Sequence, residues 1–242
     1  MKKHGMKIGV VVAFLSACLA GTSHADRRSY VWTYEYATMP AGIAEAEYYL
    51  TTKVPDSGVS EASSWQHQVE IEYGLTDNWD ISLYQMFKQS YGTDSASVFK
   101  YEGFKIRSRY KLFKSGEFIV DPLLYVEYIR NADLSEPDVL EAKLVLAKDI
   151  GKFNVAYNQI VKRELDGDAE TEHEYAAGAN YDLLPGFSAG LEAKGNYSED
   201  EHAVGPVVSI ETEKLWVSLG VAFGLNEATD DVQARMIAGF SF

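Results

Sequence analysis

The chain has 242 residues, with 22 basic and 36 acidic side chains, a formal net charge of −14 and one cysteine. This acidic balance argues against nucleic acid as a partner, because phosphates require a basic surface. The length favours one domain, and a single cysteine excludes an intramolecular disulfide.

Residues 1–25 have the pattern of a secretory signal peptide. The basic start MKKHGMK is followed by the apolar run IGVVVAFLSACLAG and by small residues at Ser23 and Ala25. We expect cleavage after Ala25, which would leave a mature chain without cysteine. The alternative is a lipoprotein box at residues 15–18, in which Cys18 becomes the lipidated N-terminus.

Residues 26–41 precede the regular pattern and alternate aromatic with polar residues over Tyr30, Trp32, Tyr34 and Tyr36. We expect an N-terminal segment that lies in the periplasm or inserts into the lumen of a barrel. An additional strand is the alternative.

Period-2 alternation of apolar and polar residues continues through residues 42–242, which we interpret as an outer-membrane β-barrel. Five short turns alternate with six longer, mostly acidic loops, as in barrels whose two rims face different compartments. The strands are expected near residues 42–52, 64–75, 79–89, 99–113, 117–130, 138–149, 153–164, 171–182, 187–197, 204–212, 215–224 and 233–242.

The segment QVEIEYGL shows which face of these strands points inward. Glu70 and Glu72 share one face, whereas Val69, Ile71 and Tyr73 share the other. The polar faces are too charged for the core of a soluble lipocalin-like or sandwich fold, which we considered as the alternative. The fold class predicted is therefore all-β, a transmembrane antiparallel up-and-down β-barrel of about 12 strands, with apolar faces towards lipid.

The inward positions form a charged network of eight acids and seven bases. We expect Arg235 to neighbour Glu45 and Glu47, since closure pairs the first and last strands, and Glu127 to neighbour the basic strand 99–113. The network either surrounds a narrow water-filled path or fills the barrel. Its members are Glu45, Glu47, Glu70, Glu72, Asp80, Lys105, Arg107, Arg109, Lys111, Glu127, Glu141, Lys143, Glu192, Lys194 and Arg235.

The last strand ends on outward aromatic residues, Phe240 and Phe242. It resembles the terminal strand of Gram-negative outer-membrane barrels, which the barrel-assembly machinery recognises. Stretches such as EYGLTDNWDISLY and YDLLPGFSAGLEA resemble strand–turn–strand units of porin-like outer-membrane proteins of unassigned function. The resemblance implies a location in the bacterial outer membrane, contact with lipid and lipopolysaccharide, and an assembly signal at the two phenylalanines.

Candidate catalytic and metal sites are weak. Barrel lipases and deacylases use a His-x-Ser pair, and none of the mature histidines has that serine. Asp166, Asp168 and Glu170 alternate in one loop and could bind a divalent cation, but the full calcium-loop pattern is absent. We expect the protein to have no cofactor and no enzymatic activity.

The function expected is that of a narrow porin-like channel for passive passage of small solutes or ions. The acidic loops predict a weak cation preference at low salt. The alternatives are a closed structural or lipopolysaccharide-interacting barrel and, as a more distant choice, an outer-rim hydrolase.

Overall fold

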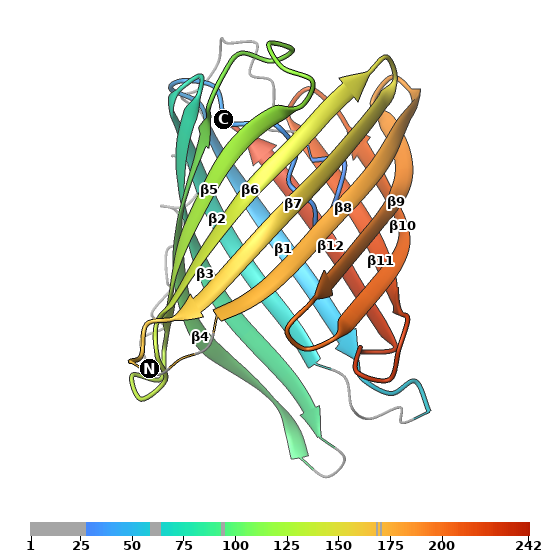
Figure 1. The fold of residues 1–242 in the computed structure, drawn as a ribbon. Coiled ribbons are helices and arrows are strands. Elements are labelled where there is room, and N and C mark those ends of the chain that lie inside the picture. The colour runs from blue at the N-terminus through green and yellow to red at the C-terminus, as the bar shows by residue number, and fades with distance from the viewer. Residues whose placement is uncertain (1–27, 59–63, 93–94, 168, 170) are drawn as a thin grey trace, which may run out of the picture.

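The structure is a computed structural model that describes residues 28–58, 64–92, 95–167, 169 and 171–242, so the predicted signal peptide and Cys18 lie outside the described residues. In these residues, twelve strands form one closed antiparallel barrel (Figure 1), which confirms the fold class predicted from the sequence. Among them there is no helix long and apolar enough to cross a membrane. The strands are β1 (Ala44–Val54), β2 (Ser64–Thr76), β3 (Trp79–Gly92), β4 (Ser95–Lys111), β5 (Asp121–Asn131), β6 (Val139–Ile150), β7 (Phe153–Glu164), β8 (Thr171–Leu184), β9 (Phe187–Asn196), β10 (Glu201–Glu211), β11 (Leu215–Gly224) and β12 (Val232–Ser241).

The two faces of the wall differ in the sense that the sequence predicts. On β2 the side chains of Val69 and Ile71 are 43% and 48% exposed, whereas Glu70 and Glu72 are fully buried. Because successive side chains of a strand point to opposite faces, the carboxylates lie inside the barrel and the apolar side chains cover its outer surface. That outer surface suits the hydrocarbon core of a bilayer.

Several predicted boundaries are wrong. We expected β5 to begin near residue 117, but it begins at Asp121, so residues 112–120 form an extended connection where a short turn was expected. This connection displays Phe118 and Ile119 to the surface, and such apolar residues mimic a strand in a sequence. Conversely, β3 continues to Gly92 and β4 begins at Ser95, so these two strands occupy most of the loop that was expected between them.

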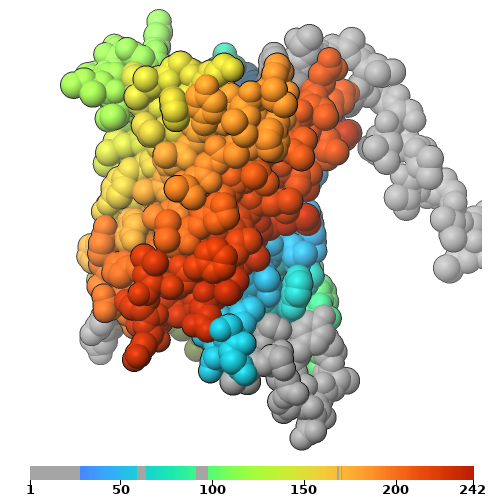
Figure 2. Space-filling model, turned by 90° about the vertical axis from the view of Figure 1, so that its right-hand side faces the viewer, coloured from blue at the N-terminus to red at the C-terminus, as the bar shows by residue number. Residues whose placement is uncertain are grey.

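Closure joins the first strand to the last. Glu45 of β1 lies opposite Ser241 of β12, and the register continues to Val54 opposite Val232. Figure 2 shows the red end of the chain beside the blue β1 on one side of the wall. We call the rim that carries the C-terminus the C-terminal rim and the other the loop rim. Closure leaves no sheet edge unpaired, as a bilayer demands.

Replacing Ile106 with arginine tests the lipid-facing surface. Ile106 lies on β4, opposite Leu83 of β3, and is 50% exposed. A charge at the depth of the bilayer centre costs about 2–4 kcal/mol, and about 0–1 kcal/mol near the interface. We therefore expect Ile106→Arg to lower the free energy of unfolding by about 2–4 kcal/mol in urea titrations in lipid vesicles. Ile119→Arg, at the C-terminal rim, is the control. Equal stability of the two variants would contradict the orientation of the wall.

Candidate functional site

The lumen contains the N-terminal segment of the described chain. Residues 28–40, which we call the plug, follow an irregular path inside the wall before the chain enters β1 (Figure 1). Most of the plug is buried, with Tyr30, Val31, Thr33 and Met39 fully so. The plug is thus an internal part of the barrel rather than an additional strand.

One carboxylate on the wall holds the middle of the plug. Glu192 of β9 accepts hydrogen bonds from three successive backbone N–H groups, those of Val31 at 2.9 Å, Trp32 at 2.9 Å and Thr33 at 2.8 Å. Glu192 itself is 1% exposed. A buried irregular segment has no strand ladder to satisfy its amides, so the wall must supply acceptors. Hydrogen bonds to an ionised group are also stronger than neutral ones.

Two inward glycines provide the space that the plug occupies. A Cβ atom on Gly178 of β8 would lie 2.4 Å from the Tyr30 ring, and one on Gly220 of β11 would lie 2.4 Å from Val31 Cγ2. Gly178 is the register partner of Glu192. The wall therefore forms a recess beside the carboxylate, and any larger side chain there would displace the plug.

Other polar side chains of the wall hold the remainder of the plug. Asn158 of β7 exchanges two hydrogen bonds with the backbone of Tyr34, at 2.6 and 2.9 Å. Asp80 accepts from Met39 N at 3.0 Å, and Ser209 Oγ donates to Arg28 O at 3.0 Å. These contacts join the plug to opposite sides of the wall, with no β-ladder between plug and wall over residues 28–40.

Beside the plug, buried charges alternate in a continuous network. Arg107 Nη2 lies 2.9 Å from Glu70 and 2.5 Å from Glu72. Arg109 contacts Glu72 and lies 2.7 Å from Asp80. All five groups are at most 2% exposed, and removing charges of this kind from water is costly unless each has a partner.

A tyrosine connects this network to the plug. The Tyr49 hydroxyl lies 2.6 Å from Glu47 and 2.7 Å from Glu70, and it accepts a hydrogen bond from Arg28 at 2.9 Å. A hydroxyl has one proton, so it donates to one of the two carboxylates at a time, while Arg28 donates to its oxygen. In this buried network the four acids Glu47, Glu70, Glu72 and Asp80 thus lie beside the three bases Arg28, Arg107 and Arg109.

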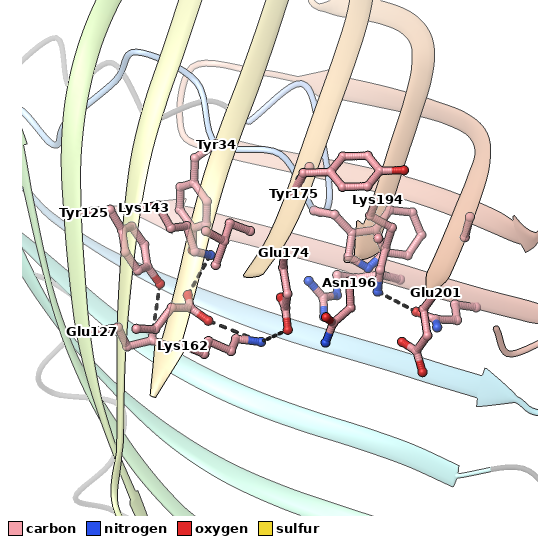
Figure 3. Close-up of a pocket in the computed structure, with 18 of the residues that line it drawn as sticks. Tyr34, Tyr125, Glu127, Lys143, Lys162, Glu174, Tyr175, Lys194, Asn196 and Glu201 are labelled. Atoms are coloured by element: carbon pink, nitrogen blue, oxygen red, sulfur yellow. Dashed lines mark hydrogen bonds and ion pairs between the residues drawn. The ribbon is translucent and has the colours of Figure 1, made fainter. Parts of the chain in front are cut away.

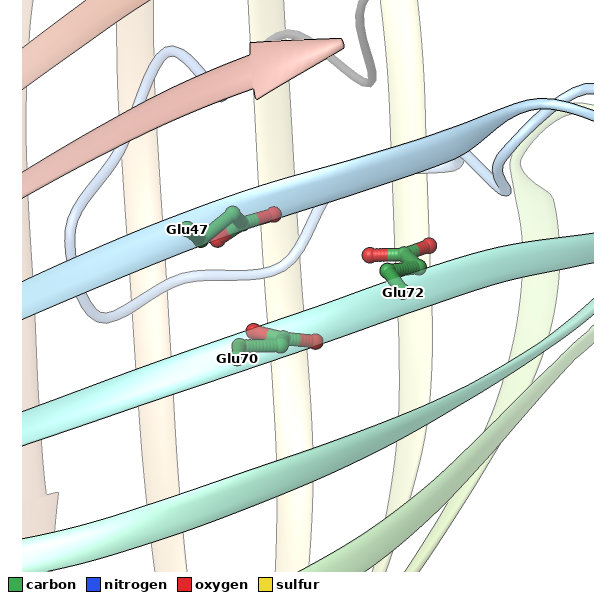
Figure 4. Close-up of side chains that lie close together, drawn as sticks. All are labelled: Glu47, Glu70 and Glu72. Atoms are coloured by element: carbon green, nitrogen blue, oxygen red, sulfur yellow. The ribbon is translucent and has the colours of Figure 1, made fainter. Parts of the chain in front are cut away.

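Glu47, Glu70 and Glu72 also form the one group of potential metal ligands found in the described residues, with oxygen atoms within 4.8 Å of one another. Figure 4 shows Glu47 on β1 facing the two glutamates of β2. Arg107 already neutralises Glu70 and Glu72 from within ion-pair distance. The geometry therefore favours an internal guanidinium partner over a bound metal ion.

The plug separates two cavities. The loop-rim cavity has a volume of about 250 Å³ and is lined on the plug by Arg28, Trp32 and Tyr34. The C-terminal cavity has a volume of about 540 Å³ and is lined on the plug by Ser29 and residues 35–38, together with Pro40. No residue lines both cavities, so the plug forms the constriction between them.

Most charges of the loop-rim cavity fall into two groups, and Figure 3 labels Lys143 and Lys162 of the first and Lys194 of the second. In the first group, lysines pair with glutamates: Lys105 with Glu127 at 3.0 Å, and Lys162 with Glu174 at 2.8 Å. Lys143 pairs with Glu141 in the same way, at 2.9 Å. The second group consists of Lys53, Lys194 and Arg235, for which no ion pair is found among the described residues.

The fifteen residues predicted for the charged network all lie inside the barrel. The five half-buried members, all basic, line the cavities: Lys111 the C-terminal cavity, and Lys105, Lys143, Lys194 and Arg235 the loop-rim cavity. The ten buried members are Glu45, Glu47, Glu70, Glu72, Asp80, Arg107, Arg109, Glu127, Glu141 and Glu192.

The expected position of Arg235 is wrong. Its register partner on β1 is Thr51, to which it donates a hydrogen bond of 2.9 Å, whereas Glu45 and Glu47 lie opposite Ser241 and Gly239. Strand alternation fixes the face of a residue but not the register between the chain ends. Glu127, in contrast, lies opposite Arg107 of β4, which is the basic strand expected to neighbour it.

From the sequence alone, no role is predicted for Gly178 and Gly220, and Glu192 is a member of the charged network with no predicted partner. The signal was present as small residues at inward positions of β8 and β11, next to an inward carboxylate. Small inward residues in a barrel indicate that another part of the chain approaches the wall closely.

Of the weak metal candidates in the loop after β7, Asp166 alone lies in the described part of the chain. Asp166 is exposed and accepts a hydrogen bond from Gly167 N at 2.7 Å, whereas Asp168 and Glu170 lie outside the described residues. Asp231, in the loop after β11, accepts hydrogen bonds from both the backbone N–H and the hydroxyl of Ser57, which follows β1. These two hydrogen bonds hold the pKa of the Asp231 carboxyl below its ordinary value.

The histidines of the described chain do not form a catalytic constellation with these loops. His202 Nε2 lies 3.5 Å from Asp200, whose side chain is 86% exposed, beyond the contact expected of an oriented base. His67 instead contacts the Tyr48 hydroxyl at 2.6 Å on the outer face. Phe240 and Phe242, the predicted assembly signal, are 40% and 47% exposed at the C-terminal rim.

Comparison with known proteins supports the fold. No protein-family model matches the chain, and no curated protein matches it. An outer-membrane channel from Pseudomonas putida F1 superposes with a TM-score of 0.62 at 12% identity, over 88% of this chain and 100% of the channel. The NanC porin superposes with a TM-score of 0.53 at 10% identity, over 81% of this chain and 98% of the porin. The chain is thus similar in fold to outer-membrane β-barrels.

The buried network predicts the effect of removing one guanidinium. Arg107→Gln leaves Glu70 without its cation and removes one guanidinium partner of Glu72. Loss of one partner of a buried ion pair costs about 3–5 kcal/mol, and we expect a loss of that order in the free energy of unfolding in lipid vesicles. Because Arg107 does not line either cavity, conductance should not rise. The double variant Arg107→Gln/Glu70→Gln should recover part of the loss.

The control is Arg130→Gln, whose partner Asp138 lies at 2.5 Å near the loop rim, where Arg130 is 35% exposed. A half-exposed pair contributes about 1 kcal/mol or less. If Arg107→Gln destabilised the barrel no more than this control, the network would not hold the wall together.

Proposed function

We propose that the protein is a narrow channel of the outer membrane for passive passage of small solutes or ions, with the plug as its constriction. The observation that carries the proposal is the pair of charged cavities towards opposite rims, with plug residues in the lining of both. The apolar outer surface and the similarity in fold to outer-membrane barrels support the location. An interior of this kind is expensive unless water reaches it.

The size of the barrel and the mode of plug attachment agree with a gated path. Twelve strands lie between the eight that side chains can fill and the sixteen or more of open porins. The plug makes side-chain hydrogen bonds to the wall and no β-ladder over residues 28–40, so the barrel ladders need not break when it shifts. Its displacement would join the two cavities.

A closed structural or lipopolysaccharide-interacting barrel is the second candidate. The buried network around Arg107 and Tyr49 favours it, because this network fills the side of the lumen next to β1–β4. We further propose that the acidic loops meet lipopolysaccharide through divalent cations and that the barrel-assembly machinery recognises the last strand. Neither partner is required for conduction.

Deleting residues 240–242 tests the assembly signal. It removes two exposed aromatic side chains, and also the hydrogen bond from Phe242 N to Ala44 O that helps to close the barrel. We expect less heat-modifiable barrel in the outer membrane and more periplasmic aggregate. The control is Phe240→Leu/Phe242→Leu, which keeps the backbone and the apolar surface. An unchanged yield of both variants would exclude an assembly signal at these residues.

Planar-bilayer recording of the refolded mature protein tests the channel. Glu192→Gln replaces a carboxylate that accepts three N–H groups by an amide with one acceptor oxygen. Hydrogen bonds to charged groups exceed neutral ones by about 1–1.5 kcal/mol, so the open-to-closed ratio should rise roughly tenfold, since 1.4 kcal/mol is a tenfold change. Wild-type events should be small and rare.

Glu199→Gln, which makes the same change in an exposed loop, is the control and should behave like the wild type. If the wild type and Glu192→Gln are both folded by heat modifiability and both silent, the channel proposal fails and the closed barrel remains.

A further inference from the structure

We propose that the loop-rim cavity contains a binding site for a small organic anion, in which Lys53, Lys194 and Arg235 receive its carboxylate groups. This inference deepens the proposed channel function and rests on it, because it names the class of solute that the path would take. The site is separate from the buried network around Arg107.

The three cations of this site have no anionic partner among the described residues. Lys194 Nζ donates to the neutral Gln233 Oε1 at 2.7 Å, and Arg235 donates to Thr51 at 2.9 Å and to Val31 O at 3.1 Å. Lys53 is the register partner of Gln233 and lines the same cavity. Three like charges thus face one space of about 250 Å³ without a counter-charge in contact.

The plug adds two hydrogen-bond donors without acceptors to the same cavity. Trp32 Nε1 and Arg28 Nε are buried and have no hydrogen-bond partner in the structure, and both residues line the loop-rim cavity. The Trp32 ring also lies within cation–π distance of two of the three cations: Lys194 Nζ lies 5.5 Å and Arg235 Cζ 5.7 Å from its centroid. Buried donors are normally satisfied, and an anion suits donors that lie beside three cations, because it accepts hydrogen bonds and also carries the opposite charge.

The acids of the cavity do not compensate for these cations. Three of them, Glu127, Glu141 and Glu174, already pair with Lys105, Lys143 and Lys162. The fourth, Glu201, begins β10 at the rim and has no ion pair with the site. Seven basic and four acidic side chains line the cavity, an excess of three positive charges.

The C-terminal cavity has the opposite balance. Its lining contains three lysines and the four acids Glu35, Asp121, Asp149 and Asp182. An anion entering at the loop rim would therefore be held on that side of the plug. The cavity should therefore prefer anions, although the acidic loops predict a preference for cations. The reason is that charges in contact with the solute are screened less than the loop charges at the mouth.

The size and donor set indicate a short chain with two carboxylates. A volume of about 250 Å³ is below the range of about 300–1,000 Å³ typical of pockets for drug-sized ligands, and the donors are spread over Lys53, Lys194, Arg235 and the plug. Succinate serves as the probe, and its neutral isostere succinamide has the same length and no charge.

The test is titration calorimetry of the refolded mature protein in detergent with succinate, at constant chloride concentration. We expect succinate to bind and succinamide not to bind. Lys194→Gln and Lys53→Gln should each weaken succinate affinity about tenfold, as loss of a charge-assisted hydrogen bond does. Lys100→Gln, which makes the same change on an exposed part of β4 outside the cavity, should leave affinity unchanged.

Inorganic phosphate is a separate arm. Stronger binding of phosphate than of succinate, lost in the same variants, would retain an anion site and overturn the carboxylate assignment. Equal binding of succinate by wild type and Lys194→Gln, or equal binding of succinamide and succinate, would overturn the site itself. All variants are first checked for heat-modifiable mobility, so that misfolding is not mistaken for lost affinity.

The recordings and the titrations together distinguish failure of the anion site from failure of the channel proposal. Single-channel events without succinate binding leave the channel proposal intact and remove the site. Succinate binding by a protein that stays silent, even as Glu192→Gln, keeps the site and removes the channel.

Discussion

The pairing of β1 with β12 is the interaction on which the rest of the molecule depends. A sheet in a bilayer cannot leave an edge unpaired, since no water is present to satisfy its N–H and C=O groups. Once the register from Glu45–Ser241 to Val54–Val232 is set, every inward side chain of the first strand faces the lumen at a fixed height. Closure therefore determines which charges become neighbours, and the plug enters a lumen whose polar groups are already in place.

The sequence predicts well which face of each strand points inward, but it predicts poorly which residues of adjacent strands lie opposite each other. Strand alternation was sufficient to place Glu70 inside and Ile71 outside, because the period of a strand is two. It could not place Arg235 beside Thr51, because register depends on the stagger of the whole closed sheet. The β5 boundary was missed because Phe118 and Ile119 are exposed in a rim connection, where apolar residues need not belong to a strand.

The plug shows a second limit of prediction from sequence. Alternating aromatics at residues 30–36 fit a strand as well as a lumenal segment, and only the wall distinguishes them. The wall does so with Gly178 and Gly220, which leave room for side chains, and with Glu192, which accepts three amides. Each of these residues is unremarkable in its own strand. Their role arises from contacts with a distant segment of the chain, which for Glu192 and Val31 is 161 residues away.

The interior then has two kinds of charged surface with different consequences. Where Arg107 and Arg109 alternate with carboxylates, each charge has a partner and the network holds the wall at β1–β4 in register. Where Lys53, Lys194 and Arg235 face the loop-rim cavity, partners are absent among the described residues, and the charges act on whatever enters. If the proposed channel conducts, the same barrel would be rigid on one side and selective on the other. The plug touches both sides, through Arg28 at Tyr49 and through Trp32 at Lys194 and Arg235, so a ligand bound at the proposed anion site would also act on the plug.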